Sequence, residues 1–363
     1  MLKLLILAGD GIGAEIMQEV ARIAAWFIAR GLPAELDEEP FGIASWKRHG
    51  TLMLPSSWAK IRAADAILFG AIGSPEYEAI PAAAKTEDLL LKMRRELDLY
   101  ANLRPVRALP ALEDASSLRP EVLRGTDLLL VRELAGGLYF GEPRGIEIAA
   151  DGTGRAFNTL VYTTREIERI ARTAFEAART RRGRVCNVDK SNVLETFRFW
   201  RDTVVSLHRR EYADVELSHQ YVDNCAMQLV RRPAQFDVIL TENLFGDILS
   251  DCAAMVAGSL GMLPSASFGP VDAAGTRRAL YEPIHGSAPD IAGRGIANPC
   301  GAILSFALCL RHTARREADA VRLEQAVERV IAGGLRTPDI ASPGSRIVGT
   351  RDMGDAILRA LET

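Results

Sequence analysis

Short apolar runs alternate with amphipathic stretches along the first third of this chain. Residues 2–8 form one apolar run, and residues 14–30 follow with apolar side chains at every third or fourth position. A helical pattern over residues 57–64 then precedes a second apolar run at residues 66–70. Apolar runs of this length indicate buried strands, and the longer periodic stretches indicate helices. Strands that alternate with helices predict an α/β fold with a largely parallel sheet.

The rest of the chain continues this alternation, with one exception. Further strands are predicted at residues 126–132, 184–189 and 236–241, an extended segment at 102–110, and helices at 87–97, 165–182, 304–311 and 320–332. The exception is the segment 145–159, where Asp151-Gly152 stands between apolar positions. This pair is typical of a tight hairpin turn, so we expect a hairpin that projects from the body. The sequence shows neither an internal repeat nor a long linker.

Length and charge exclude several classes of protein. The chain has 363 residues, 44 of them basic and 47 acidic, with a formal net charge of -3. The length predicts two domains or one large domain, and the balanced charge argues against a nucleic-acid or polybasic membrane binder. Every apolar stretch is well under the roughly 18 residues that a membrane span needs. The five cysteines lack CxxC spacing, so we expect small buried thiols in a reducing, cytoplasmic setting.

A glycine-rich turn, Gly9–Gly13, separates the first predicted strand from the first helix. Glycines at such a turn let the backbone approach a phosphate, and Asp37 stands where a ribose-binding acid would be expected. Glu15, however, would place a negative charge where that anion should bind. A dinucleotide-binding turn and a plain tight turn both fit this segment.

Two carboxylates, Asp247 and Asp251, are spaced i and i+4 within an apolar segment. On a helix they would point the same way, and two like charges are unfavourable together unless a cation lies between them. Oxygen ligands select Mg²⁺ or Mn²⁺, and Asp223 could supply a third ligand. The alternative is a solvated acidic face.

Three arginines are candidates for binding carboxylates, since a guanidinium group can grip a carboxylate through two parallel hydrogen bonds. Arg94 lies on the helix predicted at residues 87–97, Arg104 follows in the extended segment, and Arg132 ends a buried strand. Surface arginines are common, and sequence alone does not show that the three converge.

Lys190, Tyr139 and His285 are candidates for proton transfer or ligand binding. Lys190 follows a predicted strand and could transfer a proton, although a surface pairing with Asp189 is the more ordinary interpretation. Tyr139 lies among glycines that leave room for a ligand, but it could equally pack at a turn. His285 belongs to a loop rich in glycine and proline that ends near Asp290, and such loops often carry function.

Several long segments, in a fixed order, resemble the isocitrate/isopropylmalate dehydrogenase family of metal-dependent decarboxylating dehydrogenases. They are DLYANLRP at 98–105, RELAGGLYFGEPRG at 132–145, VDKSNVLE at 188–195, FDVILTENLFGDILSD at 236–251 and EPIHGSAPDIAG at 282–293. The resemblance extends from the glycine turn at Gly9 to the C-terminal helix. It implies the oxidative decarboxylation of 3-isopropylmalate in leucine synthesis, with D-malate, tartrate or another 3-alkylmalate as the alternative substrate.

The resemblance also implies a fold and an assembly. Two α/β domains would surround a central cleft that holds the active site. One would be discontinuous, residues 1–99 with 258–363, and would bind the cofactor. The other, residues 100–257, would bind substrate and metal and would carry the arm at 145–159. Two subunits would share each site, so a homodimer is implied.

The family's roles carry over to matching positions of this chain. Arg94, Arg104 and Arg132 would bind the two substrate carboxylates. The metal ligands would be Asp247, Asp251 and the partner subunit's Asp223, which would also contact substrate. The partner subunit's Lys190 would help to deprotonate the C2 hydroxyl, and Tyr139 would protonate the carbon that loses CO₂. The cofactor would contact His285, Gly286, Ser287, Ala288, Pro289, Asp290, Asn298 and Asn192. Because Asp290 would face the ribose hydroxyls, the resemblance implies NAD rather than NADP.

In this family, residues near one helix determine which alkyl group of the substrate is accepted. The resemblance places Glu87, Leu90 and Leu91 at these positions, and they match the family's pattern. The chain departs from the family at three positions: Leu89 replaces a glycine, Ala14 a proline and Ala135 a threonine. Leu89 leaves the alkyl specificity open, because an apolar pocket discriminates by only about 1 to 3 kcal/mol per methylene. A catalytically silent regulatory subunit would be expected to lack some of these metal and proton-transfer residues, and all are present.

Overall fold

The structure is a computed structural model that describes residues 1–81, 84, 89–273 and 275–363. The chain forms two compact units. Unit 1 contains Met1–Leu99, Arg107–Arg124 and Ala254–Thr363, and unit 2 contains Tyr100–Val106 and Gly125–Ala253.

These units differ from the expected domains mainly in the segment Arg107–Arg124, which was assigned to the middle domain but belongs to unit 1. Its side chains and backbone are bound to other parts of that unit. Arg107 pairs with Glu328 at 2.5 Å, and Arg336 donates to the carbonyl of Ala111 at 2.6 Å. Long-range pairs of this kind have no local sequence signal.

The strands of unit 1 follow the spatial order β2-β1-β3-β12-β11. Their bounds are β1 Leu2–Gly9, β2 Ala34–Glu38, β3 Ala66–Ala71, β11 Pro264–Phe268 and β12 Ala279–Pro283, with a small separate pair, β13 Leu335–Arg336 and β14 Arg346–Ile347. The pairs β1–β2, β1–β3 and β3–β12 are parallel, whereas β11–β12 is antiparallel. Strand β3 is buried along its whole length, as expected for a strand covered on both faces.

Unit 1 has eight helices within the described residues, and α1, α3 and α10 pack on the strands of its sheet. The helices are α1 Gly13–Ile28, α2 Ile43–His49, α3 Pro55–Ala63, α4 Leu89–Glu96, α5 Pro120–Leu123, α10 Cys300–His312, α11 Glu317–Ala332 and α12 Thr350–Leu361, with the 3₁₀ turns η1 Pro75–Ala79, η2 Pro110–Ala115, η5 Leu260–Met262 and η6 Pro338–Ile340. Helix α1 buries the stripe of Ile16, Val20, Ile23 and Phe27, as its periodicity predicts. Helix α10 is buried almost throughout and contacts β11, β12, α1 and α11. It forms the centre of the unit 1 core.

Unit 2 has the strand order β4-β5-β10-β8-β9. The bounds are β4 Ala101–Arg107, β5 Asp127–Glu133, β8 Arg184–Asp189, β9 Glu216–Tyr221 and β10 Val238–Thr241. The pairs β5–β10, β10–β8 and β8–β9 are parallel. The predicted α/β class is confirmed, and β11–β12 makes the sheet arrangement mixed rather than purely parallel.

The helices of unit 2 are α6 Thr164–Arg179, α7 Glu195–Glu211, α8 Val222–Arg231 and α9 Asn243–Ala257, with the 3₁₀ turns η3 Gly137–Tyr139 and η4 Pro233–Gln235. A capping box between Thr163 and Glu166 begins α6, because each side chain accepts a backbone N–H of the other residue. Helix α6 packs on β5, β8 and β10. Phe175 and Trp200 are fully buried in this core.

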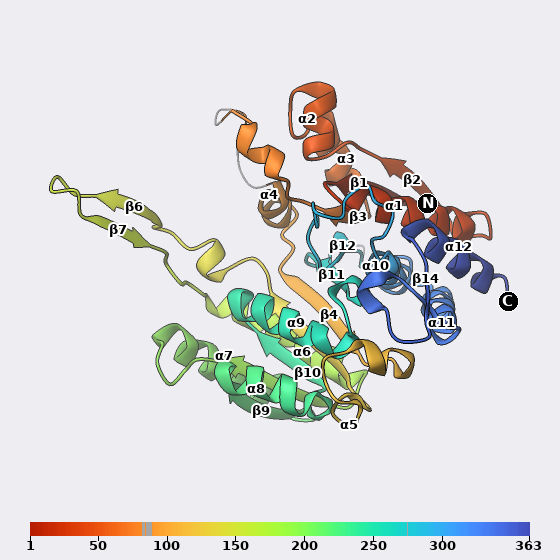
Figure 1. Ribbon diagram of the computed structural model, residues 1–363. Coiled ribbons are helices and arrows are strands. Elements are labelled where there is room, and N and C mark those ends of the chain that lie inside the picture. The colour runs from red at the N-terminus through yellow and green to blue at the C-terminus, as the bar shows by residue number, and fades with distance from the viewer. Residues whose placement is uncertain (82–83, 85–88, 274) are drawn as a thin grey trace. The chain divides into compact units, whose positions relative to one another are not determined.

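The segment predicted as a hairpin forms one, with β6 Gly145–Ile148 antiparallel to β7 Gly154–Phe157. Figure 1 shows this hairpin extending away from the rest of unit 2. Ile146 and Ile148 are exposed on it. Of the cysteines, four are buried and free, but Cys252 is exposed on α9, contrary to expectation. None of the helices within the described residues is long and apolar enough to cross a membrane.

Candidate active site

A cluster of polar side chains lies where β5 and β10 end in unit 2. Arg132 is opposite Thr241 in the parallel pair of strands, and α9 begins two residues after Thr241. Ligands of open α/β sheets bind at the carboxyl ends of the strands. Gly246 on α9 lies directly against Arg132, since a Cβ there would come 2.5 Å from the arginine Cγ. The glycine therefore allows α9 to approach the arginine closely.

Arg132 is 1% exposed and is held by two side chains of α9. Its Nε and Nη2 donate to Oδ1 of Asn243 at 3.1 and 2.8 Å. Its Nη1 lies 2.5 Å from Oδ1 of Asp247. These three contacts give the guanidinium group a fixed orientation.

Arg104 on β4 points into the same cluster. Its Nε donates to Asn102 at 2.7 Å, its Nη1 donates to Ser250 at 2.5 Å, and its Nη2 lies 3.6 Å from Asp247. Two of the three arginines singled out in the sequence therefore meet at Asp247. Arg94 belongs to unit 1.

The turn η3 carries Tyr139, whose hydroxyl donates to Oδ2 of Asp247 at 2.8 Å. Burial raises the pKa of Tyr139, and this hydrogen bond raises it further. The hydroxyl therefore keeps its proton at neutral pH and can act as a proton donor.

Asp247 and Asp251 lie one turn apart on α9, as their spacing predicts. Burial alone would raise the pKa of Asp247, but the guanidinium groups of Arg132 and Arg104 hold it below its usual range. Burial and the negative charge of Asp247 raise the pKa of Asp251, against an opposing attraction from Arg104. A divalent cation would relieve this repulsion, so the pair fits a hard metal ion.

The third proposed metal ligand does not join this pair within one chain. In the described residues, no group of three or more His, Cys, Asp or Glu side chains could hold a metal ion. Asp223, in the first turn of α8, instead accepts a 2.6 Å hydrogen bond from Lys190, which follows β8. This bond lowers the pKa of Asp223.

Beneath the cluster lies a buried network that the sequence analysis did not identify. Glu133 accepts the N–H groups of Ala135 and Gly136, and burial raises its pKa to about 7. Tyr162 donates to Glu242 at 3.3 Å, and burial raises the pKa of Glu242 as well. Glu133 and Glu242 lie in the segments 132–145 and 236–251, which carry the family resemblance. Their place in these segments is the sequence signal that could have identified them.

In unit 1, Arg94 on α4 is buried and pairs with Glu282 at 3.1 Å. Its Nε is buried without a hydrogen-bond partner among the described residues. A buried, unsatisfied guanidinium N–H is costly, and a bound carboxylate would satisfy it.

The loop after β12 carries the residues predicted to bind the cofactor. Burial lowers the pKa of His285, whose Nδ1 contacts the carbonyl of Gly286 at 2.9 Å. Its Nε2 is buried with no hydrogen-bond partner among the residues described. Gly286 and Asp290 are exposed, whereas Ser287 is buried. A buried ring nitrogen without a partner fits a loop that receives a polar ligand.

The glycine turn at the start of α1 packs against this same loop. Ile12 donates to the carbonyl of Ser287 at 2.9 Å, and a Cβ on Gly11 would lie 2.0 Å from that oxygen. Asp10 accepts the N–H groups of Ile43 and Gly73. Space that a dinucleotide phosphate would need is filled by protein, so the structure favours the plain tight turn. Asp37 pairs with Lys60 at 2.8 Å on the surface.

Other predicted contact residues have varied surroundings. Asn192 is exposed. Asn298 is buried, accepts the N–H of Cys300 at 3.0 Å and donates to Asp339 at 3.0 Å, so its amide supports the start of α10. Pro289 is exposed and Ala288 half-buried, with φ of +40° at Ala288.

The residues linked to substrate choice lie at the start of α4. Glu87 falls outside the described residues. Leu89 begins the helix and is buried, while Leu90 and Leu91 are half-buried. Leu89, which stands where the family has glycine, thus occupies interior volume. Of the other two departures, Ala14 is exposed in the first turn of α1, and Ala135 donates its backbone N–H to Glu133.

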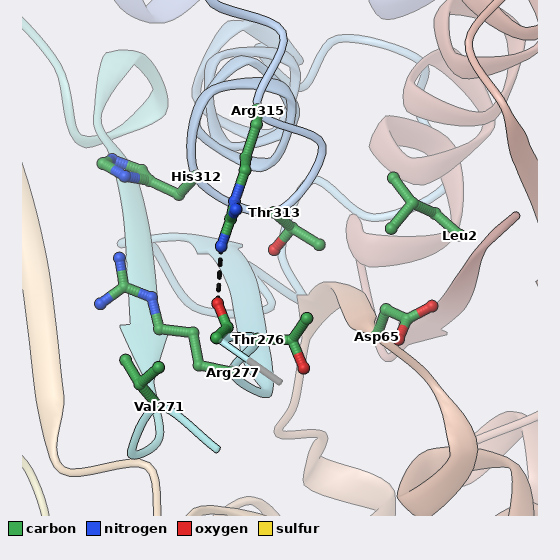
Figure 2. A pocket seen from close by; sticks show the side chains of 9 residues that line it. Leu2, Asp65, Val271, Thr276, Arg277, His312, Thr313 and Arg315 are labelled. Atoms are coloured by element: carbon green, nitrogen blue, oxygen red, sulfur yellow. Dashed lines mark hydrogen bonds between the residues drawn. The ribbon is translucent and has the colours of Figure 1, made fainter. Parts of the chain in front are cut away.

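A separate cavity of about 300 Å³ in unit 1 contains none of the predicted site residues (Figure 2). Three of its polar side chains are already hydrogen-bonded within the protein. Arg315 donates to the carbonyl of Gly275 at 2.6 Å, and the hydroxyl of Thr313 is 2.8 Å from that of Tyr281. Thr276 donates to Asp272 at 2.7 Å. This cavity therefore points to no ligand.

The sequence matches the family described as isocitrate/isopropylmalate dehydrogenase over residues 3–357. It is 58% identical to the 3-isopropylmalate dehydrogenase of Gluconobacter oxydans over 361 residues, which cover 99% of this chain and 98% of that protein. It is 58% identical to 3-isopropylmalate dehydrogenase 1 of Bordetella bronchiseptica over 363 residues, with coverage of 99% and 98%. Among solved structures, isocitrate dehydrogenase from Methylococcus capsulatus superposes with a TM-score of 0.85 at 34% identity and covers 100% of both chains.

Proposed function

The chain belongs to the isocitrate/isopropylmalate dehydrogenase family, and on that basis we propose that it converts 3-isopropylmalate to 4-methyl-2-oxopentanoate and CO₂ with NAD. This is the third step of leucine biosynthesis. The observation that carries the proposal is the convergence of Arg104, Arg132 and Tyr139 on Asp247. A cationic pocket, a carboxylate and a protonated phenol are the groups that the decarboxylation of a dicarboxylic acid needs.

Substrate binding is assigned to the arginines. Arg104 and Arg132 are buried and oriented by Asn102, Ser250 and Asn243, so their guanidinium planes present a preformed surface to carboxylates. Arg94 would bind a carboxylate through its unsatisfied Nε. Glu87, Leu90 and Leu91 would contact the isopropyl group.

Mg²⁺ or Mn²⁺ would be held by Asp247 and Asp251, together with Asp223 of the partner subunit. The raised pKa of Asp251 supports this assignment, because a carboxylate that resists ionisation beside another gains from a cation. When bound, the metal would act as a Lewis acid that stabilises negative charge on the substrate oxygens.

NAD would be held by the loop of His285, Gly286, Ser287, Ala288, Pro289 and Asp290, with Asn298 and Asn192 as further contacts. The buried, partnerless Nε2 of His285 supports this role. The exposed carboxylate of Asp290 favours NAD over NADP, since a 2′-phosphate would meet its charge. When bound, NAD would accept the hydride from C2.

Protein side chains would move the two protons. The partner subunit's Lys190 would take the C2 hydroxyl proton as the C2 hydrogen leaves as hydride. The bond between C3 and its carboxylate would then break, releasing CO₂ and leaving the electron pair at C3. Tyr139 would donate its proton to C3, which completes the product. The raised pKa of Tyr139 keeps that proton available.

The assembly proposed is a homodimer in the cytoplasm, with each site shared by two subunits. Asp223 and Lys190 support this, because within one chain they pair with each other rather than with Asp247 and Asp251. Exposed apolar side chains supply surface for such contacts: Ile146 and Ile148 on the hairpin, Met227 and Val230 on α8, and Ile248 and Met255 on α9.

The second candidate is a D-malate, tartrate or other 3-alkylmalate dehydrogenase. The buried Leu89 supports this candidate, because its added volume at the start of α4 would reshape a pocket for the substrate's alkyl group. The chemistry and the proposed roles of Tyr139 and Asp247 would be unchanged.

The test is to follow NADH absorbance with 3-isopropylmalate, D-malate, tartrate and isocitrate in the presence of Mg²⁺ or Mn²⁺. NADP and a metal-free reaction serve as controls. A kcat/KM for 3-isopropylmalate far above the others supports the proposal. A preference for D-malate or tartrate supports the second candidate. Turnover of none of the four contradicts the proposal and excludes D-malate and tartrate as the alternative substrates.

A further inference from the structure

Asn243 links two parts of the proposed active site that come from different segments. Its Oδ1 accepts two hydrogen bonds from Arg132, and its Nδ2 donates to the carbonyl of Gly136 at 3.1 Å. Gly136 precedes the turn η3, which carries Tyr139. One amide thus touches both the buried arginine and the turn that presents the phenol.

The chemistry of its neighbours fixes the orientation of this amide. An arginine only donates hydrogen bonds and a backbone carbonyl only accepts them. The oxygen of Asn243 must therefore face Arg132 and its nitrogen must face Gly136. Asn243 is 0% exposed, so water cannot replace either contact at low cost.

The residue preceding Asn243 strengthens this position. Glu242 accepts the N–H groups of Leu244 and Phe245 and so stabilises the start of α9. The hydroxyl of Tyr162 accepts the backbone N–H of Asn243 at 3.1 Å. Hydrogen bonds therefore fix both the backbone and the side chain of Asn243, so its position can in turn fix the groups that it contacts.

We propose that Asn243 is a positioning residue that fixes the Arg132 guanidinium and the turn η3 relative to each other. The substrate carboxylate bound by Arg132 is then held in the correct position relative to the proton donor Tyr139. The proposal rests on the function proposed above. It predicts that the loss of Asn243 acts on catalysis through Tyr139 and on substrate binding through Arg132.

The principal test is a double-mutant cycle between Asn243→Ala and Tyr139→Phe. Alone, Asn243→Ala is expected to lower kcat by about ten- to hundredfold, the range expected when a reacting group is misplaced. It should also raise the KM for substrate, while the KM for NAD stays constant. In the Tyr139→Phe background, the same change should lower kcat less than about threefold, because the group it positions is gone.

A second variant separates the two contacts. Asn243→Asp keeps an oxygen for Arg132 but has no N–H for Gly136. We expect it to lower kcat in the same way as Asn243→Ala while raising the substrate KM less. If Asn243→Ala does not fold, Asn243→Asp still tests the proposal. If neither variant folds, Asn243 is a structural residue and the proposal is wrong.

Thr241→Val is the matched control. Thr241 is equally buried, two residues away, and donates to the carbonyl of Val188 at 3.2 Å. Thr241→Val should lower the melting temperature, but its effect on kcat should be the same in the parent protein and in the Tyr139→Phe protein. Equal, additive losses of kcat for Asn243→Ala in both backgrounds would show a general structural effect and overturn the proposal.

A readout that needs no substrate keeps this test distinct from that of the proposed function. A crystal structure of Asn243→Ala without substrate shows where the turn η3 lies. We expect the turn to be displaced, so that the Tyr139 hydroxyl no longer lies within hydrogen-bond distance of Asp247, as it does at 2.8 Å in the parent protein. An unchanged Tyr139–Asp247 contact contradicts the positioning role, whatever substrate the enzyme prefers.

Discussion

The Tyr139 hydroxyl donates a 2.8 Å hydrogen bond to Oδ2 of Asp247. The other oxygen of the same carboxylate lies 2.5 Å from Arg132. One carboxylate thus joins the proposed proton donor to the proposed substrate-binding arginine. A cation bound at Asp247 would compete with these protein contacts, so metal binding and release of the Tyr139 hydroxyl toward substrate are expected to be coupled.

Replacement of Tyr139 by phenylalanine tests the proton donor directly. We expect Tyr139→Phe to lower kcat by about 10²- to 10⁴-fold, the usual contribution of a positioned acid. The KM for NAD should not change, because the loop of His285 is untouched. Steady-state kinetics on the NADH signal measure both quantities, and a kcat within threefold of the parent protein would exclude Tyr139 as the donor.

The paired carboxylates of α9 predict stabilisation by metal. Mg²⁺ or Mn²⁺ at about 100 times its Kd should stabilise the protein by about 2.7 kcal/mol, seen as a higher melting temperature in calorimetry. Asp251→Asn should abolish this shift.

Without metal, Asp251→Asn should be neutral or slightly stabilising, because it removes the repulsion that raises the pKa of Asp251. Asp214→Asn is the control, since Asp214 is an exposed carboxylate paired with Arg179 and should leave the metal response intact. A full response to metal in Asp251→Asn would exclude it as a ligand.

Glu133 predicts a pH dependence of stability. Burial raises its pKa from 4.5 to about 7 in the folded chain. The folded state therefore holds a proton that the unfolded state releases, and the free energy of unfolding falls as pH rises from 4.5 through 7. The contribution is fully present below pH 4.5 and amounts to about 3 kcal/mol at most.

Urea unfolding of the parent protein and Glu133→Gln at pH 5 and pH 8 measures this contribution. The stability of the parent relative to the variant should be lower at pH 8 than at pH 5. A relative stability that is constant, or that rises with pH, would mean that Glu133 is ionised throughout.

Gly137 predicts a steric limit on the turn that carries Tyr139. Its φ is +75°, and a Cβ there would lie 2.6 Å from the Tyr162 hydroxyl oxygen and 3.2 Å from Oε2 of Glu242. We expect Gly137→Ala to cost about 2 to 4 kcal/mol and to lower kcat by displacing Tyr139.

Gly183→Ala separates backbone strain from this clash. Gly183 has a φ of +72°, but a Cβ there meets no described atom within 4 Å. It should cost only the backbone term, about 1 to 2 kcal/mol, and leave kcat unchanged. Equal losses of stability at the two glycines, measured by urea unfolding, would contradict the steric argument.

The sequence by itself determined the features that depend on neighbouring residues. Apolar periodicity predicted β1, α1, β3 and α6 to within a few residues, because amphipathic helices and buried strands need those patterns. The spacing of Asp247 and Asp251 predicted two carboxylates on one helical face for the same local reason. Several motifs together, rather than any single one, predicted the family and its fold, and the comparisons with known proteins confirmed both.

Only the tertiary structure decided which distant groups meet. Arg94 and Glu282 are 188 positions apart, Tyr162 and Glu242 are 80 apart, and Arg132 and Asn243 are 111 apart. No local pattern encodes such pairs, because they arise only when folding brings separate helices, strands and loops together. The raised pKa of Glu133 has the same origin: a carboxylate that looks ordinary in the sequence becomes hard to ionise once folding removes the water around it.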